Sequence, residues 1–260
     1  FQLKGAETME TVQYIEEILS SYEFEGNYTG YRHITAGHIN TTFALQFDVN
    51  GKNKQYIAQR INTNVFKKPV ELMENMVNVT CHLAEKIKAN GGDTERETLC
   101  ALIAKDGKPY HIMVDGSFWR CVNFITDAYS CDTIENPQVF FNAGAAFGDC
   151  MSKLADFDGS TLHETIPDFH NTKQRFQNFL VALEANKSGR KDNVKEEIDF
   201  VLQREKEAEK LVNLIAEGKL PIRVTHNDTK INNIMFDNQS NLGLCVLDLD
   251  TVMPGVSLYD

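Results

Sequence analysis

A short polar segment near the end of the chain constrains the fold more than any other feature. It reads H-N-D-T-K-I-N-N from His226 to Asn233, and it is followed by the apolar stretch 244–247 and then by Asp248-Leu249-Asp250. The apolar stretch predicts a strand that ends in carboxylates. A loop carboxylate, an amide oxygen and a carboxylate at a strand end are parts that phosphoryl transfer needs. The alternative is a polar turn whose Asx side chains cap backbone groups.

The chemistry of the reaction explains why these residue types occur together. A transferred phosphoryl group spreads negative charge over its oxygens, so catalysis consists mostly of positioning and charge neutralisation. Asp228 is predicted to accept a hydrogen bond from the substrate hydroxyl and to hold it in line with the γ-phosphorus of ATP. Asn233 and Asp248 carry the hard oxygen atoms that Mg²⁺ prefers as ligands. The segment therefore predicts an enzyme that uses ATP and Mg²⁺.

Two further residues of the segment are candidates for the catalytic machinery. Lys230 lies two residues past Asp228, where its charge can reach the γ-phosphate. His226 is included as well, although we expect it to brace the loop through hydrogen bonds rather than to take part in chemistry. The predicted catalytic set is thus Asp228, Lys230 and His226, and the predicted function is that of a small-molecule kinase.

Composition narrows the class of protein. With 260 residues, 42% of them apolar, the chain is long enough to bury a core as one large domain or as two lobes. Its net charge of −11 argues against nucleic acid or an anionic membrane as a partner. No signal peptide or membrane-spanning run is apparent, and the six cysteines include no C-x-x-C pair. We expect free, mostly buried thiols, a cytoplasmic location and a small-molecule substrate.

The first part of the chain is rich in strand signals. Apolar and polar residues alternate between Tyr31 and Val49 around a polar break at 36–40, and Asn50-Gly51 predicts a tight hairpin into a strand at 56–61. A second hairpin is predicted at Asp115-Gly116. Helices are predicted over 7–21 and 69–90.

The second part is mainly helical, with helices predicted over 137–156, 168–185 and 193–217. An antiparallel sheet with a long helix, followed by helices that carry the catalytic loop, is the order of elements in a bilobal protein-kinase-like fold. The predicted fold class is therefore α+β. We expect residues 1–126 to form an ATP-binding N-lobe with the hinge, and residues 127–260 to form a helical C-lobe.

In this fold the first lobe holds the nucleotide, and three segments are candidates for contacting it. The polar break between the first two strands can bring backbone N–H groups close to phosphate oxygens, although an empty hairpin turn is the alternative. The hinge, expected within 120–127, would read the adenine edge, whereas Trp119 is expected to pack in the core. The candidates in the break and the hinge are Gly37, His38, Asn40, Thr41, Asn123, Phe124 and Ile125.

Arg60 is the third candidate for nucleotide binding. It lies on the strand after the polar break, at the position of the Lys in the V-A-I-K motif of kinases, and is predicted to hold the α- and β-phosphates. A carboxylate of the following helix is expected to pair with it. Both Glu71 and Glu74 qualify, and Glu74 is favoured because it lies deeper in the helix. The alternative for Arg60 is an exposed arginine on a strand.

At these residues the chain resembles the aminoglycoside phosphotransferase and choline kinase superfamily, and within it the N-acetylhexosamine 1-kinases. The spacing H-x-D-x-x-x-x-N is common to the superfamily and to protein kinases, whereas other matching blocks are narrower. The matching blocks are Gly37–Asn40, Gln59–Asn62, Asn64–Glu71, Met73–Asn75, Asn123–Ile125, Thr225–Asn233 and Val246–Gly255.

The resemblance implies that the enzyme transfers phosphate from ATP to the anomeric hydroxyl of N-acetylglucosamine or N-acetylgalactosamine. It implies that Asp228 is the catalytic base, that Asn233 and Asp248 hold the metal, and that Asp250 adds a ligand or orients the site. Kinases of this superfamily have a longer helical lobe after the D-x-D strand, so the C-lobe is expected to be incomplete at its C-terminal end. We expect such a chain to bind nucleotide but to turn over poorly.

Three other functions are compatible with parts of the sequence. The chain could be another kinase of the superfamily that acts on an aminoglycoside, choline or homoserine. It could be a pseudokinase that only binds ATP, although the intact Asp228, Asn233 and Asp248 argue against this. A metal-dependent hydrolase would need metal-binding histidine spacing, and neither H-E-x-x-H nor H-x-x-E-H occurs.

Overall fold

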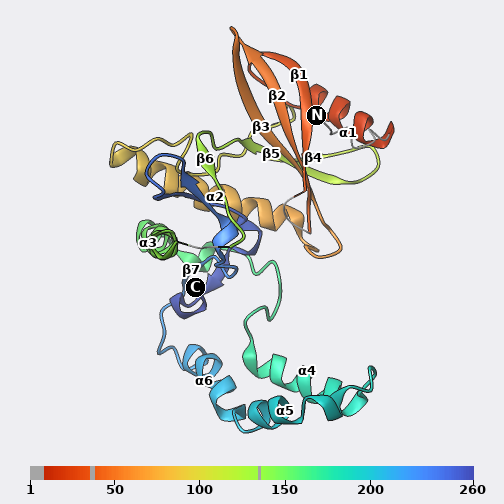
Figure 1. Cartoon of the computed structure of the whole chain (residues 1–260), viewed down its shortest axis with the longest axis vertical. Coiled ribbons are helices and arrows are strands. Elements are labelled where there is room, and N and C mark those ends of the chain that lie inside the picture. The colour runs from red at the N-terminus through yellow and green to blue at the C-terminus, as the bar shows by residue number, and fades with distance from the viewer. Residues whose placement is uncertain (1–8, 36–38, 134–135) are drawn as a thin grey trace.

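An antiparallel sheet forms the first part of the molecule (Figure 1). The computed structural model describes residues 9–35, 39–133 and 136–260. Its largest sheet has five strands in the order β1-β2-β3-β5-β4, and each neighbouring pair is antiparallel. The strands are β1 (Asn27–Ile34), β2 (Thr41–Val49), β3 (Lys52–Ile61), β4 (His111–Ile112) and β5 (Phe118–Asn123).

Both predicted hairpins of this sheet are present. Asn50 and Gly51 connect β2 to β3 with φ angles of 54° and 81°. Positive φ at both central positions is what the tight hairpin turn requires, which explains the Asn-Gly pair. The second hairpin joins β4 to β5 and contains Gly116, whose φ is 81°.

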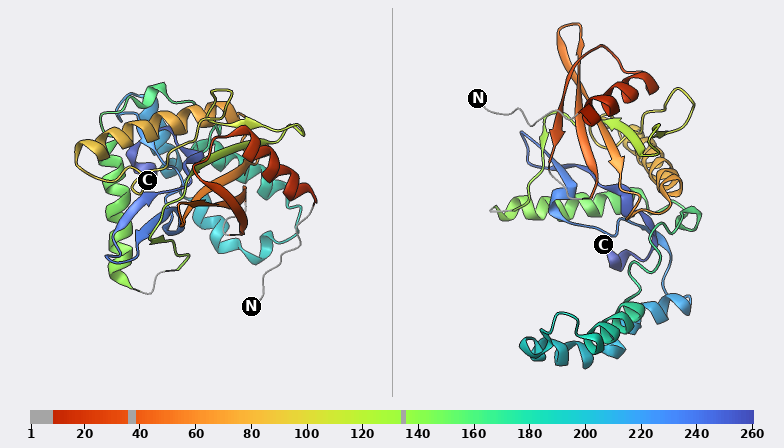
Figure 2. Two further views of the ribbon diagram at one scale, coloured as in Figure 1. Left: turned by 90° about the horizontal axis from the view of Figure 1, so that it is seen from above. Right: turned by 90° about the vertical axis from the view of Figure 1, so that its right-hand side faces the viewer.

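Helices α1 (Met9–Ser21) and α2 (Pro69–Ala89) cover opposite faces of the sheet (Figures 1 and 2). The α1 face is aromatic, and Trp119 is fully buried there, which confirms its predicted packing role. The α2 face is aliphatic, and α2 also packs on residues from the second half of the chain, such as Leu249. Helix α2 thus packs on both the sheet and the segment that carries the D-x-D sequence.

A buried asparagine fastens α2 to that second half. The side-chain nitrogen of Asn75 donates hydrogen bonds to the carbonyl oxygens of His163 (2.8 Å) and Val252 (2.9 Å), and its oxygen accepts one from the backbone N–H of His163 (2.8 Å). All strong hydrogen-bonding groups of this buried amide are engaged, so the contact resists displacement.

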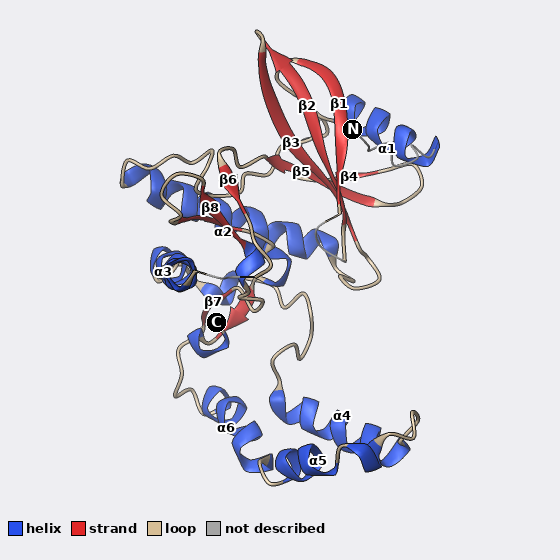
Figure 3. Cartoon of the chain, in the orientation of Figure 1, coloured by secondary structure: helices blue, strands red, loops and turns tan. Residues whose placement is uncertain are grey.

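The helices of the second half form two groups. Helix α3 lies beside α2, whereas α4, α5 and α6 lie together at the opposite end of the molecule from the large sheet (Figure 3). The part of the chain that the structure describes contains no helix with both the length and the apolar character needed to cross a membrane. The helices are α3 (Pro137–Lys153), α4 (Thr172–Ala185), α5 (Lys195–Leu202) and α6 (Glu205–Ala216).

The prediction of one helix over 193–217 is wrong, because the segment is broken at Gln203 and Arg204. The Arg204 guanidinium lies 3.4 Å from the centre of the Phe200 ring and donates a hydrogen bond to the Phe200 carbonyl oxygen (2.8 Å). Helix α4 begins later than predicted because Asp168 has a φ of 59°, and because the Asn171 side chain caps the helix by accepting a hydrogen bond from the Gln174 N–H (3.0 Å).

Two small sheets and several short 3-10 turns position the end of the chain. One sheet has the order β6-β8-β9, and the other pairs β10 with β7. The strands are β6 (Ala128–Tyr129), β7 (Arg223–Thr225), β8 (Ile234–Asp237), β9 (Gly243–Val246) and β10 (Met253–Gly255), and the turns are η1 (Gly159–Thr161), η2 (Lys191–Asn193), η3 (Ile231–Asn233), η4 (Leu249–Thr251) and η5 (Ser257–Tyr259).

All six cysteines lie in the described ranges and are free, as expected from their spacing. The expectation that most are buried was wrong. Only Cys121 and Cys245 are buried, whereas Cys81 and Cys100 are exposed. Burial raises the pKa of the Cys121 and Cys245 thiols, because a thiolate is poorly solvated in an apolar core.

Candidate active site

The segment from His226 to Asn233 forms a loop between β7 and β8 and brings the predicted catalytic residues together. The side-chain nitrogen of Asn233 donates to the backbone oxygen of Asp228 (2.9 Å) and contacts its Oδ2 at 3.3 Å. Lys230 Nζ lies 2.7 Å from the same Oδ2. The Asp228 carboxylate is half-exposed, so a substrate can reach it. Because its amide nitrogen is engaged, Asn233 keeps its amide oxygen for another partner.

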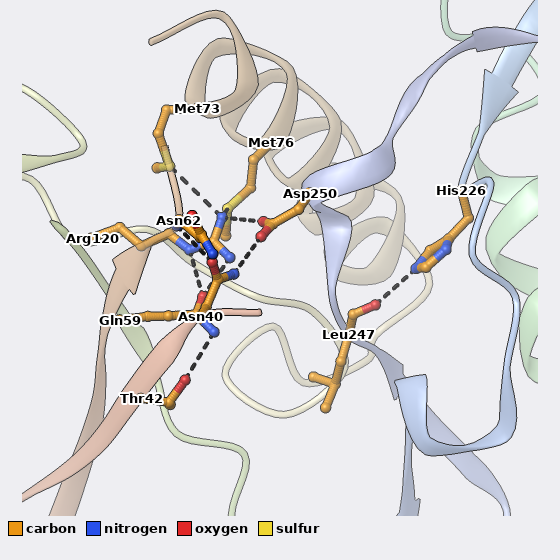
Figure 4. A network of polar contacts seen from close by, with 10 residues as sticks. All are labelled: Asn40, Thr42, Gln59, Asn62, Met73, Met76, Arg120, His226, Leu247 and Asp250. Atoms are coloured by element: carbon orange, nitrogen blue, oxygen red, sulfur yellow. Dashed lines mark hydrogen bonds and ion pairs between the residues drawn. The ribbon is translucent and has the colours of Figure 1, made fainter. Parts of the chain in front are cut away.

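His226 braces this loop, as the sequence predicted. Its Nε2 lies 2.8 Å from the Leu247 carbonyl oxygen (Figure 4), and its Nδ1 lies 3.3 Å from the backbone nitrogen of Asp228. A carbonyl only accepts and a backbone N–H only donates, so these contacts assign a neutral ring with its proton on Nε2. The imidazole therefore joins the loop at Asp228 to the residue before Asp248.

Sequence reasoning missed Asp260, which also holds the loop. Its carboxylate accepts hydrogen bonds from the backbone N–H groups of His226 (2.8 Å) and Asn227 (2.7 Å). Thr251 adds a hydrogen bond to the His226 carbonyl oxygen (2.6 Å). Asn227 has a φ of 67°, which asparagine tolerates better than most residues. No local pattern identifies Asp260, because its partners lie more than thirty residues earlier in the chain.

Asp248 is placed at the end of β9 with its carboxylate free. Its backbone is left-handed, with φ 56° and ψ 58°, and the next residue begins the η4 turn. Burial raises the pKa of Asp248 above its usual range, and the nearby charge of Asp250 raises it further. Among the described residues, no group forms a hydrogen bond or an ion pair with this side chain. A partly buried carboxylate without a partner suits a cation.

Asp250, by contrast, is already engaged by protein groups (Figure 4). Arg120 Nη1 lies 2.6 Å from Oδ1 as an ion pair without hydrogen-bond geometry, and Asn40 donates from Nδ2 to Oδ2 at 2.7 Å. The residue is 1% exposed. Of the two roles predicted for Asp250, orienting the site is therefore favoured over binding a metal.

The predicted ion pair between Arg60 and an α2 carboxylate is wrong. The Arg60 side chain lies on the α1 face, where Nη1 is 3.4 Å from the Tyr14 hydroxyl and the guanidinium is 5.5 Å from the centre of the Tyr14 ring. Glu74 pairs with His163 at 2.7 Å and Glu71 pairs with Lys68 at 3.0 Å. Successive side chains of a strand point to opposite faces of the sheet. The residues directly before and after Arg60 in β3 therefore face α2, whereas Arg60 faces α1.

The cation that does face α2 is Arg120, which sequence reasoning missed. It lies directly across the ladder from Gln59, is 5% exposed, and donates from Nε to the Gln59 side-chain oxygen (3.0 Å). The sulfur atoms of Met73 and Met76 lie 3.9 and 3.4 Å from Nη1. Alternation along β5 contained the signal: Phe118, Arg120 and Val122 must share one face.

The other predicted nucleotide contacts are placed as follows. Gly37 and His38 lie outside the described residues. Asn40 accepts a hydrogen bond from the backbone N–H of Asn62 (2.9 Å) through its side-chain oxygen, and Thr41 begins β2 with an exposed side chain. Both functional atoms of the Asn40 side chain are therefore engaged within the protein.

Residues 120–123 of the predicted hinge belong to strand β5, and residues 124–127 follow it. The Asn123 side chain accepts from the Cys100 N–H (2.6 Å) and donates to the carbonyl oxygens of Glu95 (2.9 Å) and Thr98 (3.1 Å). Phe124 is half-buried and Ile125 is buried. Asn123 thus holds the segment after α2 against the hinge, a structural task that leaves any nucleotide contact to the backbone.

The sequence also matches a known protein family. Residues 30–260 match the model of the phosphotransferase enzyme family. The chain belongs to that family. It is therefore a phosphotransferase. The matched residues include the loop at Asp228, which leads into the η3 turn, and the D-x-D segment, which contains the η4 turn.

Two solved structures align with this phosphotransferase over most of its length. A spectinomycin phosphotransferase in complex with ADP and spectinomycin aligns with a TM-score of 0.55 at 16% identity, covering 96% of this chain and 71% of that one. The ethanolamine kinase of Plasmodium vivax aligns with a TM-score of 0.49 at 14% identity, covering 100% of this chain and 73% of that one. The first likeness confirms the predicted kinase-like fold.

A cavity of about 210 Å³ adjoins the loop between β7 and β8 at Asn227. One wall is aromatic: the His170 ring stacks on Tyr259 with centres 4.7 Å apart, and His170 Nε2 lies 3.3 Å from the Asn227 carbonyl oxygen. Glu164 and Asp168 line the same cavity. Its lining includes Asn227, the chain neighbour of Asp228, so it is a candidate for holding part of an acceptor.

Proposed function

We propose that the protein is an ATP- and Mg²⁺-dependent small-molecule kinase, with residues 1–126 as the nucleotide-binding lobe and hinge and 127–260 as the lobe that carries the catalytic loop. One observation supports it above the others. The loop joins Asp228 to Asn233, while Asp248 presents an unpartnered carboxylate at the end of β9. This combination supplies an orienting base and two oxygen donors, which phosphoryl transfer requires.

The donor set suits Mg²⁺. Asn233 would contribute its amide oxygen and Asp248 its carboxylate, and Mg²⁺ takes one or two protein oxygens together with phosphate oxygens and water. Among the described residues no three His, Cys, Asp or Glu side chains form a metal cluster, so phosphate oxygens would complete such a site. When bound, the ion would neutralise charge on the β- and γ-phosphates.

The residues of the loop have distinct tasks in the proposed reaction. Asp228 accepts the proton of the acceptor hydroxyl as the oxygen forms a bond to the γ-phosphorus. The bond from that phosphorus to the β–γ bridging oxygen breaks, and ADP leaves with the electron pair. Lys230, held beside Asp228, provides positive charge for the phosphoryl oxygens. His226 keeps the loop in place through its neutral ring.

We propose an N-acetylhexosamine as the acceptor, phosphorylated at its anomeric hydroxyl. The support is the resemblance of the blocks Gln59–Asn62 and Val246–Gly255 to N-acetylhexosamine 1-kinases. A second candidate is a cationic acceptor such as an aminoglycoside or an amino alcohol. It is supported by the carboxylates of Glu164 and Asp168 in the cavity and by the fold shared with spectinomycin phosphotransferase.

Phosphorus NMR of the protein with Mg·ATP tests the proposal. N-acetylglucosamine, N-acetylgalactosamine, choline and kanamycin are offered together, and the expected product is a signal coupled to an anomeric proton. Asp228→Asn should lower the rate by about 10²–10⁴, the usual contribution of a positioned acid–base group. Asp199→Asn, on the exposed face of α5, is the matched control and should act like the unaltered protein.

The outcomes separate the candidate functions. A phosphorylated amine acceptor would keep the kinase and replace the sugar. A rate that is unchanged in Asp228→Asn would reject the assigned base. ATP binding without transfer to any acceptor would favour a protein that only binds nucleotide.

A further inference from the structure

A buried polar network lies beside Asp248 and has no part in the proposed reaction. We call it the Arg120 cluster, and it consists of Arg120, Asp250, Gln59 and Asn40 (Figure 4). We propose that Arg120 is a positioning residue for Mg²⁺-dependent nucleotide binding, which it controls by holding both Asp248 and the end of the turn before β2. This inference rests on the proposed kinase function and assigns a role to a residue outside its chemistry.

The guanidinium of Arg120 is held in one orientation. It is 5% exposed, and Gln59 accepts from its Nε at 3.0 Å, while Nη1 reaches Asp250 at 2.6 Å. The Gln59 amide nitrogen in turn donates to the Thr42 hydroxyl (3.0 Å). Because Nε and Nη2 both donate to Gln59, the guanidinium is fixed against β3, and its charge holds the Asp250 carboxylate close to strands β3 and β5.

Asp250 transmits this position to Asp248. The two residues are separated by one position, and Asp248 has a left-handed backbone, which aspartate adopts more readily than most residues but still at a cost in energy. On its N-terminal side the chain is held by the hydrogen bond from the Leu247 N–H to the Asn233 carbonyl oxygen (2.7 Å). On its C-terminal side the chain is held by Asp250, which lies within the η4 turn. A strained residue persists where both flanks are fixed, and Arg120 fixes the second flank.

The Asp250 carboxylate also contacts the residue before β2, in the first part of the chain. Asn40 donates from Nδ2 to Asp250 Oδ2 at 2.7 Å and accepts from the Asn62 N–H at 2.9 Å. The start of β2 is thereby tied to the D-x-D turn across the interface between the sheet and the catalytic segment. Asp250 therefore links two groups of residues that a bound Mg-nucleotide would contact from opposite sides.

The test measures ADP binding by calorimetry over a range of Mg²⁺ concentrations, together with thermal unfolding. Arg120→Met should weaken the Mg²⁺-supported binding of ADP by about 10–100-fold, as losses of residues that orient metal ligands do. Arg120→Lys should recover part of this loss, because the charge remains but the fork is absent. Asn40→Ala, at a half-buried site, should weaken binding by a smaller factor and keeps the ion pair intact.

Lys86→Met is the matched control. Lys86, on α2, forms an ion pair with Asp156, which also joins the first part of the chain to the second, but it makes no contact with the D-x-D turn. This variant should keep the Mg²⁺ dependence of the unaltered protein even where its melting temperature falls. A structural role alone would lower melting temperatures without changing that dependence.

The outcomes distinguish the role of Arg120 from the proposed kinase function. If folded Arg120→Met binds Mg·ADP as the unaltered protein does, the inference is overturned and the kinase proposal stands. If Arg120→Met does not fold, Arg120→Lys and Asn40→Ala decide, and the unaltered Mg²⁺ dependence of both would overturn it. If the unaltered protein binds ADP without Mg²⁺ or not at all, the proposed function and the inference fall together.

Discussion

The two faces of the large sheet carry arginines that lie close together in the ladder but have opposite surroundings. Arg60, on the α1 face, is half-buried and lies against Tyr14, whose hydroxyl also donates to Asp115 (2.9 Å). Arg120, on the α2 face, is buried and paired with Asp250. The α1 face is otherwise an aromatic core, whereas the α2 face places polar side chains against the D-x-D turn.

If Arg120 acts as proposed, one sheet separates stability from function by face. Side chains on the α1 face contribute mainly through buried apolar area and aromatic contacts. Those of the Arg120 cluster are desolvated charges and amides, which are costly unless every partner is present. Changes on the two faces should therefore differ in kind as well as in size.

The largest effect is expected for Asp250→Ala, which leaves the buried guanidinium of Arg120 unpaired. Removing one partner of a buried ion pair costs about 3–5 kcal/mol of unfolding free energy. Urea unfolding measures the loss. The double variant Arg120→Met/Asp250→Ala should recover a large part of it, and additive losses in this cycle would mean that the pair is not coupled.

Trp119→Phe should separate stability from metal dependence on the α1 face. The indole is fully buried and its Nε1 donates to the Ser117 hydroxyl (2.9 Å), so the change leaves a cavity and an unpaired oxygen. We expect a loss of about 1–3 kcal/mol in urea unfolding. The Mg²⁺ dependence of ADP binding should stay unchanged, and an altered dependence would break the division between the faces.

Asp248→Asn should raise the stability of the nucleotide-free protein while weakening Mg²⁺ binding. The raised pKa of Asp248 means that the folded state favours the protonated form, so stability falls as pH rises through the interval above its unfolded pKa and stays reduced at neutral pH. Asparagine removes that penalty and suits the left-handed backbone. Thermal unfolding at pH 7 should show a gain of about 0.5–1 kcal/mol; a loss would contradict the electrostatic account.

Arg60→Met is expected to have the smallest effect. Its contacts with Tyr14 are a long hydrogen bond and a partly solvated cation–π contact, and such contacts contribute about 0.5–1 kcal/mol. The affinity for ADP should stay unchanged in calorimetry. A large loss of affinity would restore Arg60 as a nucleotide contact and would show that its side chain turns toward the other face on binding.

Much of the local structure could be predicted because its causes are local. The Asn50-Gly51 hairpin follows from the backbone freedom of two adjacent residues, and the start of α2 follows from Pro69. The break at Gln203 and Arg204 could not be predicted, because no proline or glycine marks it. There α6 packs on α4, and the contact of Arg204 with Phe200 accompanies the break, so the helix ends despite its propensity.

The sequence by itself determined the parts of the candidate site that lie within one short loop and one strand end. Asp228, Lys230 and Asn233 are neighbours in the chain, so their spacing alone brings them together. Only the tertiary structure determined that Arg120 is the buried arginine and that Glu74 pairs with His163. It also determined that Asp260 holds the loop. The physical reason is that strand register and packing decide which face a side chain points to and which groups it contacts. Register and packing depend on residues that are far apart in the chain.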